Sequence, residues 1–232
     1  MPKSKTKLPM HPMERKIPLN RMSDITWRIF RIMSEFVEGF QFLSQFHKEV
    51  TIFGSARLPK GNKWVKEAER LGKILAKHGY TVITGGGPSI MEAANKGAHS
   101  VDPRKSIGIN IQLPMEQRTN PYVSKSKGFY YFFTRKVMLA ASAQSYIFFP
   151  GGFGTLDEFT EILALIQTGK MQKTPVILVG KDFWNPLVNW MKQTLVKDFQ
   201  SIKPADINLF HVVNSAEEAY KYIKGSKERT IF

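Results

Sequence analysis

Short apolar runs alternate with longer amphipathic stretches along most of the chain. The runs have the length and composition of buried strands, and they cover residues 50–53, 80–84, 106–110, 145–149, 176–179 and a last one near 209–213. Apolar positions recur at helical spacing between these runs, over residues 61–78, 89–99, 155–169, 182–197 and 215–223. This alternation predicts an α/β fold with a mostly parallel sheet that carries helices on both faces.

One part of the pattern is less regular. Residues 111–127 contain two prolines and many polar residues and show neither period. The aromatic run Phe129–Phe133 is typical of a strand, and Thr134 after it is a suitable cap for a helix over 135–143. We therefore predict a strand at 129–133, followed directly by that helix.

The N-terminal region divides into two parts ahead of the first strand. Residues 1–22 are rich in proline and polar residues, which predicts a basic, flexible arm. Ser23 and Asp24 can cap a helix that gives the second part the bounds 23–47, and its apolar positions form a wide stripe from Ile25 to Leu43. This helix must pack outside the core sheet or against a second subunit. Residues 48–232 then form the main domain.

The composition excludes several classes of protein. The 232 residues include no cysteine, so disulfides, thiolate metal sites and a cysteine nucleophile are ruled out. No apolar run approaches the length of a membrane span, and the basic N-terminus lacks the apolar core of a secretory signal. We expect a cytoplasmic protein that does not contact a membrane.

The formal net charge of +15 is the unusual feature of the composition. A basic chain can bind nucleic acid, or it can attract small phosphorylated molecules through its field. Residues 1–22 carry part of the charge, with six Lys and Arg against one Glu. Because no known nucleic-acid module accompanies the charge, we do not expect nucleic acid to be the main partner.

Glycine turns follow three of the predicted strands. They lie at Gly54-Ser55, at Gly85-Gly86-Gly87 and at Gly151-Gly152. Ligands of open α/β sheets bind at the carboxyl ends of the strands, so these turns are expected to line one crevice. The triple-glycine turn is neither a Walker loop nor a dinucleotide fingerprint, because no Gly-Lys-Ser/Thr follows it and the next strand ends in Asn110 instead of an acid.

The stretch from Pro150 to Glu158 is the most informative part of the sequence. A strand that ends in glycines and a threonine before a helix makes an anion site, since free backbone N–H groups and the positive helix end point at one spot. Glu158 and Glu161 share a face of that helix. The alternative is that both acids only complement the helix dipole.

Arg135 and Lys136 are predicted to begin the preceding helix, where cations oppose the dipole. Such a violation of a local rule is typical of functional sites. A phosphate or a carboxylate in the crevice would make the placement favourable.

These residues together resemble the LOG ("lonely guy") family of nucleotide 5′-monophosphate phosphoribohydrolases. The resemblance rests on Thr84–Pro88, Arg135–Met138 and the run PGGFGTLDE at 150–158, and it covers about residues 48–223. It implies a modified Rossmann fold, no cofactor or metal, and a homodimer or higher oligomer. Ser89 departs from the glycine that many relatives have, and it adds stiffness to that turn.

The resemblance also implies roles for individual residues. It implies that Arg135 and Glu158 are the catalytic pair. The residues expected to contact the substrate are Gly54, Ser55, Gly85, Gly86, Gly87, Lys136, Met138, Gly151, Gly152, Gly154, Thr155 and Glu161. Among these, Gly151, Gly152, Gly154 and Thr155 are expected to hold the 5′-phosphate.

The expected reaction is hydrolysis of the N-glycosidic bond of a nucleoside 5′-monophosphate, such as AMP or an N6-modified AMP. Cleavage builds positive charge on the ribose, by analogy with glycoside hydrolysis. Glu158 can stabilise that charge or activate the attacking water, and Arg135 can hold the phosphate or orient Glu158. The residues leave open which base is released.

Two other functions compete with this one. Relatives often carry the label lysine decarboxylase, which requires pyridoxal phosphate on a lysine; Lys136 is the one candidate, and its flanking residues do not resemble such a site. The second is a non-catalytic protein that binds nucleotides or single-stranded nucleic acid through its charge, with steep salt dependence.

Overall fold

A single parallel sheet of seven strands forms the centre of the computed structural model, which describes residues 22–112 and 119–228. The strand order is β4-β3-β2-β1-β5-β6-β7. The strands are β1 (Glu49–Phe53), β2 (Thr81–Thr84), β3 (Ser106–Ile111), β4 (Lys125–Phe129), β5 (Ser145–Phe148), β6 (Val176–Val179) and β7 (His211–Val213). The predicted arm at 1–22 lies outside the described residues except for its last position, as do residues 113–118 and 229–232.

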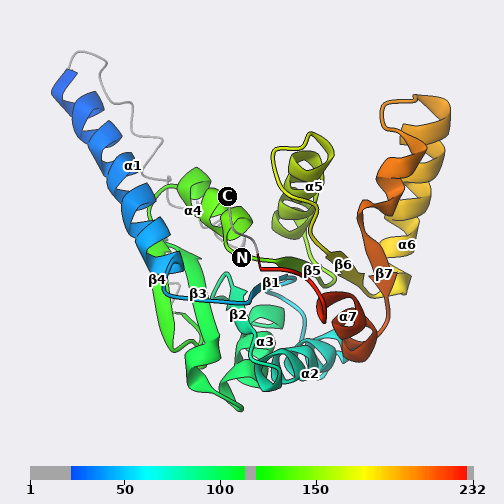
Figure 1. The fold of residues 1–232 in the computed structure, drawn as a ribbon, viewed down its shortest axis with the longest axis horizontal. Helices are drawn as coiled ribbons and strands as arrows, with labels where there is room; N and C mark the ends of the chain where they lie inside the picture. The colour runs from blue at the N-terminus through cyan, green and yellow to red at the C-terminus, as the bar shows by residue number, and fades with distance from the viewer. Residues whose placement is uncertain (1–21, 113–118, 229–232) are drawn as a thin grey trace, which may run out of the picture.

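Helices cover both faces of the sheet (Figure 1). One face carries α2 (Lys63–Lys77), α3 (Ile90–His99) and α7 (Ala216–Ile223). The other carries α1 (Met22–Leu43), α4 (Phe132–Ala141), α5 (Phe153–Gln167) and α6 (Lys181–Trp190), which continues into the π-helical η3 (Met191–Asp198). Two 3₁₀ segments, η2 (Pro103–Lys105) and η4 (Pro204–Leu209), complete the described elements.

The two cores follow from side-chain alternation along the strands. Tyr146 and Phe148 of β5 face the core under α4 and α5, whereas Ile147 and the adjoining Phe149 face the core under α2 and α7. All of β2, β5 and β6 is buried, which explains why these strands read as continuous apolar runs in the sequence. The predicted α/β architecture with helices on both faces is confirmed.

The predicted strand at 129–133 is wrong. β4 ends at Phe129, and Phe132 and Phe133 form the first turn of α4, where both side chains are exposed. β4 is an edge strand that carries Lys125 and Lys127, so its own sequence lacks the apolar signature of a strand. The aromatic run belongs to the helix that follows. Thr134 therefore lies inside α4 and does not cap it.

α1 begins at Met22, so Ser23 and Asp24 lie in its first turn and do not precede it as a cap. Its C-terminal half packs against α4 and β4, with Phe36 and Phe40 at the core beneath. Its N-terminal half projects from the body of the protein (Figure 1). α1 therefore packs outside the core sheet, which is one of the two arrangements predicted from the sequence.

The chain reverses its direction across the sheet between β1 and β5. From β1 it winds outward through β2 and β3 to β4, and it then returns through α4 to β5 on the other side. Neighbouring strands whose connections leave in opposite directions open a crevice at their carboxyl ends. The fold therefore places its ligand crevice between β1 and β5, where two of the predicted glycine turns lie.

Two glycines set the close packing of α2 on α3. A β-carbon on Gly97 would lie 1.9 Å from the carbonyl oxygen of Glu69, and one on Gly72 would lie 2.2 Å from that of Ala94.

We expect Gly97→Ala to lower the free energy of unfolding by about 1–3 kcal/mol, because the helices must separate. Gly61→Ala is the control, since its β-carbon meets nothing within 4 Å. Urea unfolding compares both variants, and equal stability would contradict this packing.

Candidate active site

A cavity of about 650 Å³ lies at the carboxyl ends of β1, β2 and β5. Apolar side chains, among them Phe53, Met91 and Leu139, form part of its wall. The cavity brings together eight of the predicted site residues: Gly54, Ser55, Gly85, Arg135, Gly152, Gly154, Thr155 and Glu158. The expectation that three glycine turns line one crevice is therefore met by the fold.

The other six predicted residues do not line this cavity. Gly86 and Gly87 are buried, and Gly151 is half-buried and packs against Thr155. Met138 is fully buried and faces α1, where a β-carbon on Gly39 would lie 2.5 Å from its sulfur. Lys136 and Glu161 lie beside the cavity and form an ion pair of 3.1 Å.

Packing explains only one of the three glycines in the loop after β5 and at the start of α5. Gly151 has a packing reason, because a β-carbon there would lie 2.1 Å from the hydroxyl oxygen of Thr155. Gly152 and Gly154 have none: a β-carbon on either meets nothing within 4 Å, and neither has a positive φ. Both line the cavity at the N-terminus of α5. Bare backbone facing open space at a helix N-terminus is suited to an anion.

Glu158 lies in the second turn of α5 with its side chain in the cavity wall. It is 2% exposed, and neither carboxylate oxygen has a hydrogen-bond partner within the described residues. Burial raises the pKa of Glu158 to about 7, although Lys136 and Arg135 act in the opposite direction. An unpartnered buried carboxyl of this kind is costly for stability and is typical of a group kept for chemistry.

Arg135 lies next to Glu158 in the cavity wall, with Nη2 4.0 Å from Oε1. Its guanidinium also lies over the ring of Phe132, 4.8 Å from the centroid. Burial lowers the pKa of Arg135, and the nearby Glu158 and Asp157 oppose that shift. At this separation the pair attracts without a hydrogen bond. Both groups therefore keep donor and acceptor positions free for a ligand.

Lys136, the residue after Arg135, forms ion pairs with two carboxylates of α5. Its ammonium lies 2.6 Å from Asp157 and 3.1 Å from Glu161. Burial would lower the pKa of Lys136, but the contacts with these carboxylates outweigh burial and raise it. Because α4 begins at Phe132, Arg135 and Lys136 lie in its second turn and not at its N-terminus as predicted. Their placement is explained by the carboxylates of α5.

The triple-glycine turn after β2 has an unusual backbone. Gly86 has a φ of +72°, which requires glycine or strains any other residue. Ser89 has a φ of +63°, in a region that side chains rarely adopt, and its hydroxyl donates to the carbonyl of Leu58 at 2.8 Å. Serine at this position is therefore strained, and its hydrogen bond ties the turn to the loop after β1.

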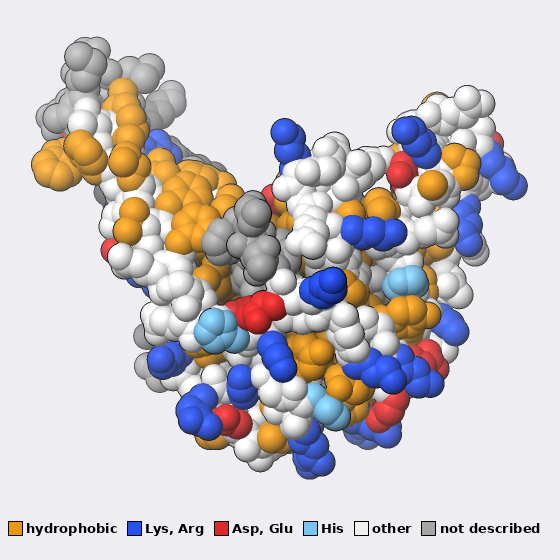
Figure 2. Space-filling view, in the orientation of Figure 1, with side chains coloured by type: hydrophobic (Ala, Val, Ile, Leu, Met, Phe, Trp, Pro, Cys, Tyr) orange, Lys and Arg blue, Asp and Glu red, His pale blue; other side chains and the backbone are white. Residues whose placement is uncertain are grey.

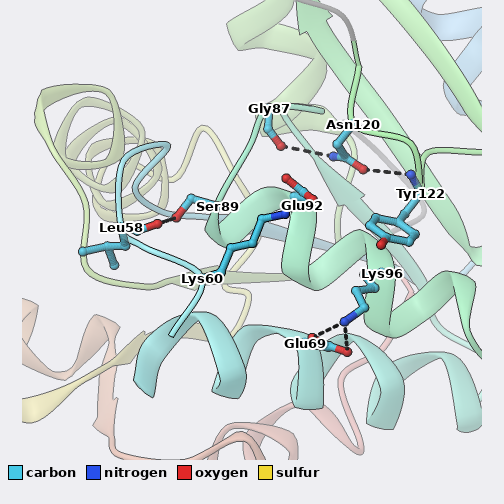
Figure 3. Close-up of polar contacts among 9 residues, drawn as sticks. All are labelled: Leu58, Lys60, Glu69, Gly87, Ser89, Glu92, Lys96, Asn120 and Tyr122. Atoms are coloured by element: carbon cyan, nitrogen blue, oxygen red, sulfur yellow. Dashed lines mark hydrogen bonds and ion pairs between the residues drawn. The ribbon is translucent and has the colours of Figure 1, made fainter. Parts of the chain in front are cut away.

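A buried polar network that the sequence pattern did not reveal holds this turn in place. The amide of Asn120 donates to the carbonyl of Gly87 at 3.1 Å and to the side-chain oxygen of Asn95 at 3.0 Å. Thr84 donates to the same oxygen and accepts from the N–H of Gly86. Asparagines carry no periodic signal, so only a contact between distant segments could identify them. Figure 3 shows Asn120 reaching Gly87 from the neighbouring segment.

Neither a metal site nor a membrane span is found in the described part of the chain. No group of three or more His, Asp or Glu side chains is arranged to hold a metal ion among residues 22–112 and 119–228. None of the described helices combines the length and hydropathy that crossing a bilayer requires. The acids beside the cavity are instead paired with Arg135 and Lys136.

Known proteins resemble this chain over a segment that carries much of the cavity wall. The family described as "Possible lysine decarboxylase" matches residues 91–223, which include α4, the loop after β5 and α5. A rice protein named cytokinin riboside 5′-monophosphate phosphoribohydrolase LOG is 29% identical over 160 residues, 67% of this chain and 64% of its own. The phosphoribohydrolase of Rhodococcoides fascians is 24% identical over 179 residues, 76% of this chain and 89% of its own.

The chain belongs to the LOG family. The match to the rice protein spans less than two thirds of that protein's length. Among solved structures, TM1055 superposes with a TM-score of 0.57 at 26% identity and covers 76% of this chain and 98% of its own. Its likeness supports the Rossmann-type assignment.

The other description of the LOG family, a lysine decarboxylase, does not fit the residues present. A Schiff base with pyridoxal phosphate requires a lysine that can lose its proton. Lys136 is held between Asp157 and Glu161, and its pKa is raised. Lys136 is therefore kept charged and is not suited to form a Schiff base.

The buried carboxyl predicts a pH-dependent stability. Unfolding returns Glu158 to an ordinary pKa of 4.5, so between pH 4.5 and 7 the folded state holds the extra proton and loses stability as the pH rises. We expect the stability of Glu158→Gln relative to the wild type to grow over this range by on the order of 3 kcal/mol. Urea unfolding across the pH range measures the difference. A pH-independent difference would exclude a buried, perturbed carboxyl.

Proposed function

We propose that this protein hydrolyses the N-glycosidic bond of a nucleoside 5′-monophosphate, releasing the base and ribose 5-phosphate. The observation that carries the proposal is Glu158: a buried carboxyl without hydrogen bonds, next to Arg135 and within one turn of bare glycine backbone. The printed names of the rice and Rhodococcoides fascians relatives support the same reaction class. AMP and N6-modified AMP are the substrates that we would test first.

The loop after β5 is proposed to bind the 5′-phosphate. Gly152 and Gly154 leave the N-terminus of α5 open to the cavity, where backbone N–H groups and the helix dipole favour an anion. A phosphate fixed there contributes binding energy remote from the bond that breaks. It therefore places the ribose along the wall that Glu158 forms.

Glu158 is proposed to act on the ribose at C1′. Loss of the base develops positive charge on the sugar, and a carboxylate within the apolar wall stabilises that charge or takes a proton from the attacking water. With a pKa of about 7, Glu158 can gain or lose its proton near neutral pH. We therefore expect kcat/KM to rise on the acid side as Glu158 ionises.

Arg135 and Lys136 are proposed to set the charge state of that carboxyl. Both cations lower the pKa of Glu158 against the effect of burial. Arg135 also has a buried Nε without a hydrogen-bond partner within the described residues, so it can bind the phosphate or a ribose hydroxyl. Arg135 and Lys136 are thus proposed to set the charge of Glu158, and Arg135 also to orient the substrate.

A panel of nucleoside 5′-monophosphates tests the proposed function. The wild type is expected to release base and ribose 5-phosphate from at least one of them, measured by chromatography. Glu158→Gln is expected to lower kcat by about 100-fold or more, because the amide can neither ionise nor take a proton. Glu69→Gln is the control, since Glu69 pairs with Lys96 on the opposite face of the sheet. No release from any substrate would refute the proposal.

The same preparation distinguishes the non-catalytic alternative. Oligonucleotide binding is measured over a range of salt concentrations, because binding through phosphate contacts weakens steeply with salt. Tight, salt-dependent binding together with no turnover would favour a nucleic-acid-binding protein. Turnover with weak oligonucleotide binding supports the hydrolase.

We also propose that the protein forms a homodimer or higher oligomer through an apolar surface on α1 and α4. The exposed side chains of this surface are Ile25, Trp27, Ile29, Phe30, Met33, Val37, Phe132, Phe133 and Val137. Figure 2 shows hydrophobic side chains gathered over the projecting α1 and along its inner side. Phe153, which lines the cavity, is 92% exposed as well, and we expect a second copy to cover this residue together with the surface on α1 and α4.

Substitutions on the projecting helix test the oligomer. We expect Trp27→Glu combined with Phe30→Glu to shift the molar mass measured by light scattering from the oligomer to the monomer, because each charge would have to be buried in the interface. Phe199→Glu is the matched control, since Phe199 is equally exposed but follows η3, far along the chain from α1. A wild type that is monomeric at all concentrations would contradict the proposal.

A further inference from the structure

Helix α4 carries Arg135 and Lys136 but lacks a cap of its own. Its N-cap residue is Tyr131, whose side chain makes no capping hydrogen bond. The first turn of a helix leaves backbone N–H groups without partners, and these are usually satisfied by Ser, Thr, Asp or Asn at the N-cap. A carboxylate can also stabilise a helix start by accepting from the N–H of the N-cap residue itself, as the acid of a capping box does.

Glu35 of α1 takes this role from outside the helix, through the N-cap residue Tyr131 and Tyr130 before it. One carboxylate oxygen accepts from the N–H of Tyr130 at 2.7 Å. The other accepts from the N–H of Tyr131 at 3.3 Å and from the hydroxyl of Thr134 at 2.6 Å. A carboxylate at a helix N-terminus also interacts favourably with the helix dipole, and hydrogen bonds to a charged acceptor are the stronger kind.

Further contacts fix α4 against α1. The guanidinium of Arg31 lies over the ring of Tyr130, 4.2 Å from the centroid. One turn beyond Glu35 along α1, Gly39 allows Met138 to approach so closely that a β-carbon would lie 2.5 Å from its sulfur. The height and rotation of α4 are therefore set by a helix that precedes the matched family segment at 91–223.

We propose that Glu35 is a positioning residue for the reaction, which holds the N-terminus of α4 so that Arg135 faces Glu158. The inference rests on the proposed function. Glu35 hydrogen-bonds to Thr134, the residue immediately before Arg135. Arg135 lies 4.0 Å from Glu158, a distance at which a small shift of the helix changes their attraction.

Loss of the cap is expected to affect chemistry more than binding. The proposed phosphate loop belongs to α5, which Glu35 does not contact in any described hydrogen bond, so we expect the main hold on the phosphate to be kept. Displacement of Arg135 and Lys136 weakens the two cations that lower the pKa of Glu158. The carboxylate form then becomes scarcer at neutral pH, and kcat falls.

The test compares Glu35→Ala, Glu35→Gln and the matched control Glu38→Gln. Glu38 lies one turn along α1 and pairs with Lys127 of β4, so its loss leaves α4 capped. We expect Glu35→Ala to lower kcat by about tenfold with KM changed less than about twofold, as for the loss of one cap interaction. The acid limb of its pH profile, where activity rises as Glu158 ionises, is expected to move to higher pH. Glu35→Gln, which keeps an acceptor oxygen, retains intermediate activity.

A readout without substrate separates this inference from the proposed function. The pKa of Glu158, followed by carboxyl NMR, is expected to rise in Glu35→Ala and to stay unchanged in Glu38→Gln. This shift is measurable even if no monophosphate is a substrate, so failure of the proposed function leaves it standing. If Glu35→Ala fails to fold, Glu35→Gln provides the same comparison. Lower thermal stability with unchanged kcat, acid limb and Glu158 pKa would show a purely structural role and overturn the inference.

Discussion

Glu158 is buried without a hydrogen-bond partner among the described residues, between a wall of apolar side chains and two cations. Burial favours the neutral form of a carboxyl, whereas Arg135 and Lys136 favour the charged form. The balance of these opposed effects leaves its pKa close to neutral. The site can keep this balance only if α4 and α5 hold the charges at fixed distances, and much of the packing around the crevice serves that requirement.

The parallel sheet provides the frame for this arrangement. Adjacent carboxyl ends of β1, β2 and β5 place their turns around one cavity, and the return of the chain through α4 delivers Arg135 to the same edge. α4 lacks a local cap and takes one from Glu35 on α1. Its C-terminal end is tied to β1 by a hydrogen bond of 2.9 Å between Ser142 and Thr51. Each end of the helix is therefore fixed by a different element.

The sequence pattern predicted the elements whose signal is local. Continuous apolar runs identified β1, β2 and β5 because these strands are buried on both faces, and the glycine turns located the cavity. The pattern failed at β4, where an edge strand rich in lysine gives no apolar run and the aromatic residues after it belong to a helix. Met138 was assigned to the substrate by resemblance, but the side chain is fully buried against α1.

What the pattern could not predict are contacts between segments far apart in the chain. Asn120, Asn95 and Thr84 form a network that holds the triple-glycine turn, yet none of them has a periodic signal. Glu35 precedes Thr134 by 99 residues, and in the sequence it is one acid among others on an amphipathic helix. Its importance follows from what α4 lacks. A helix that carries two cations and has no cap of its own needs an anion from elsewhere, and the capping carboxylate comes from the helix packed against it.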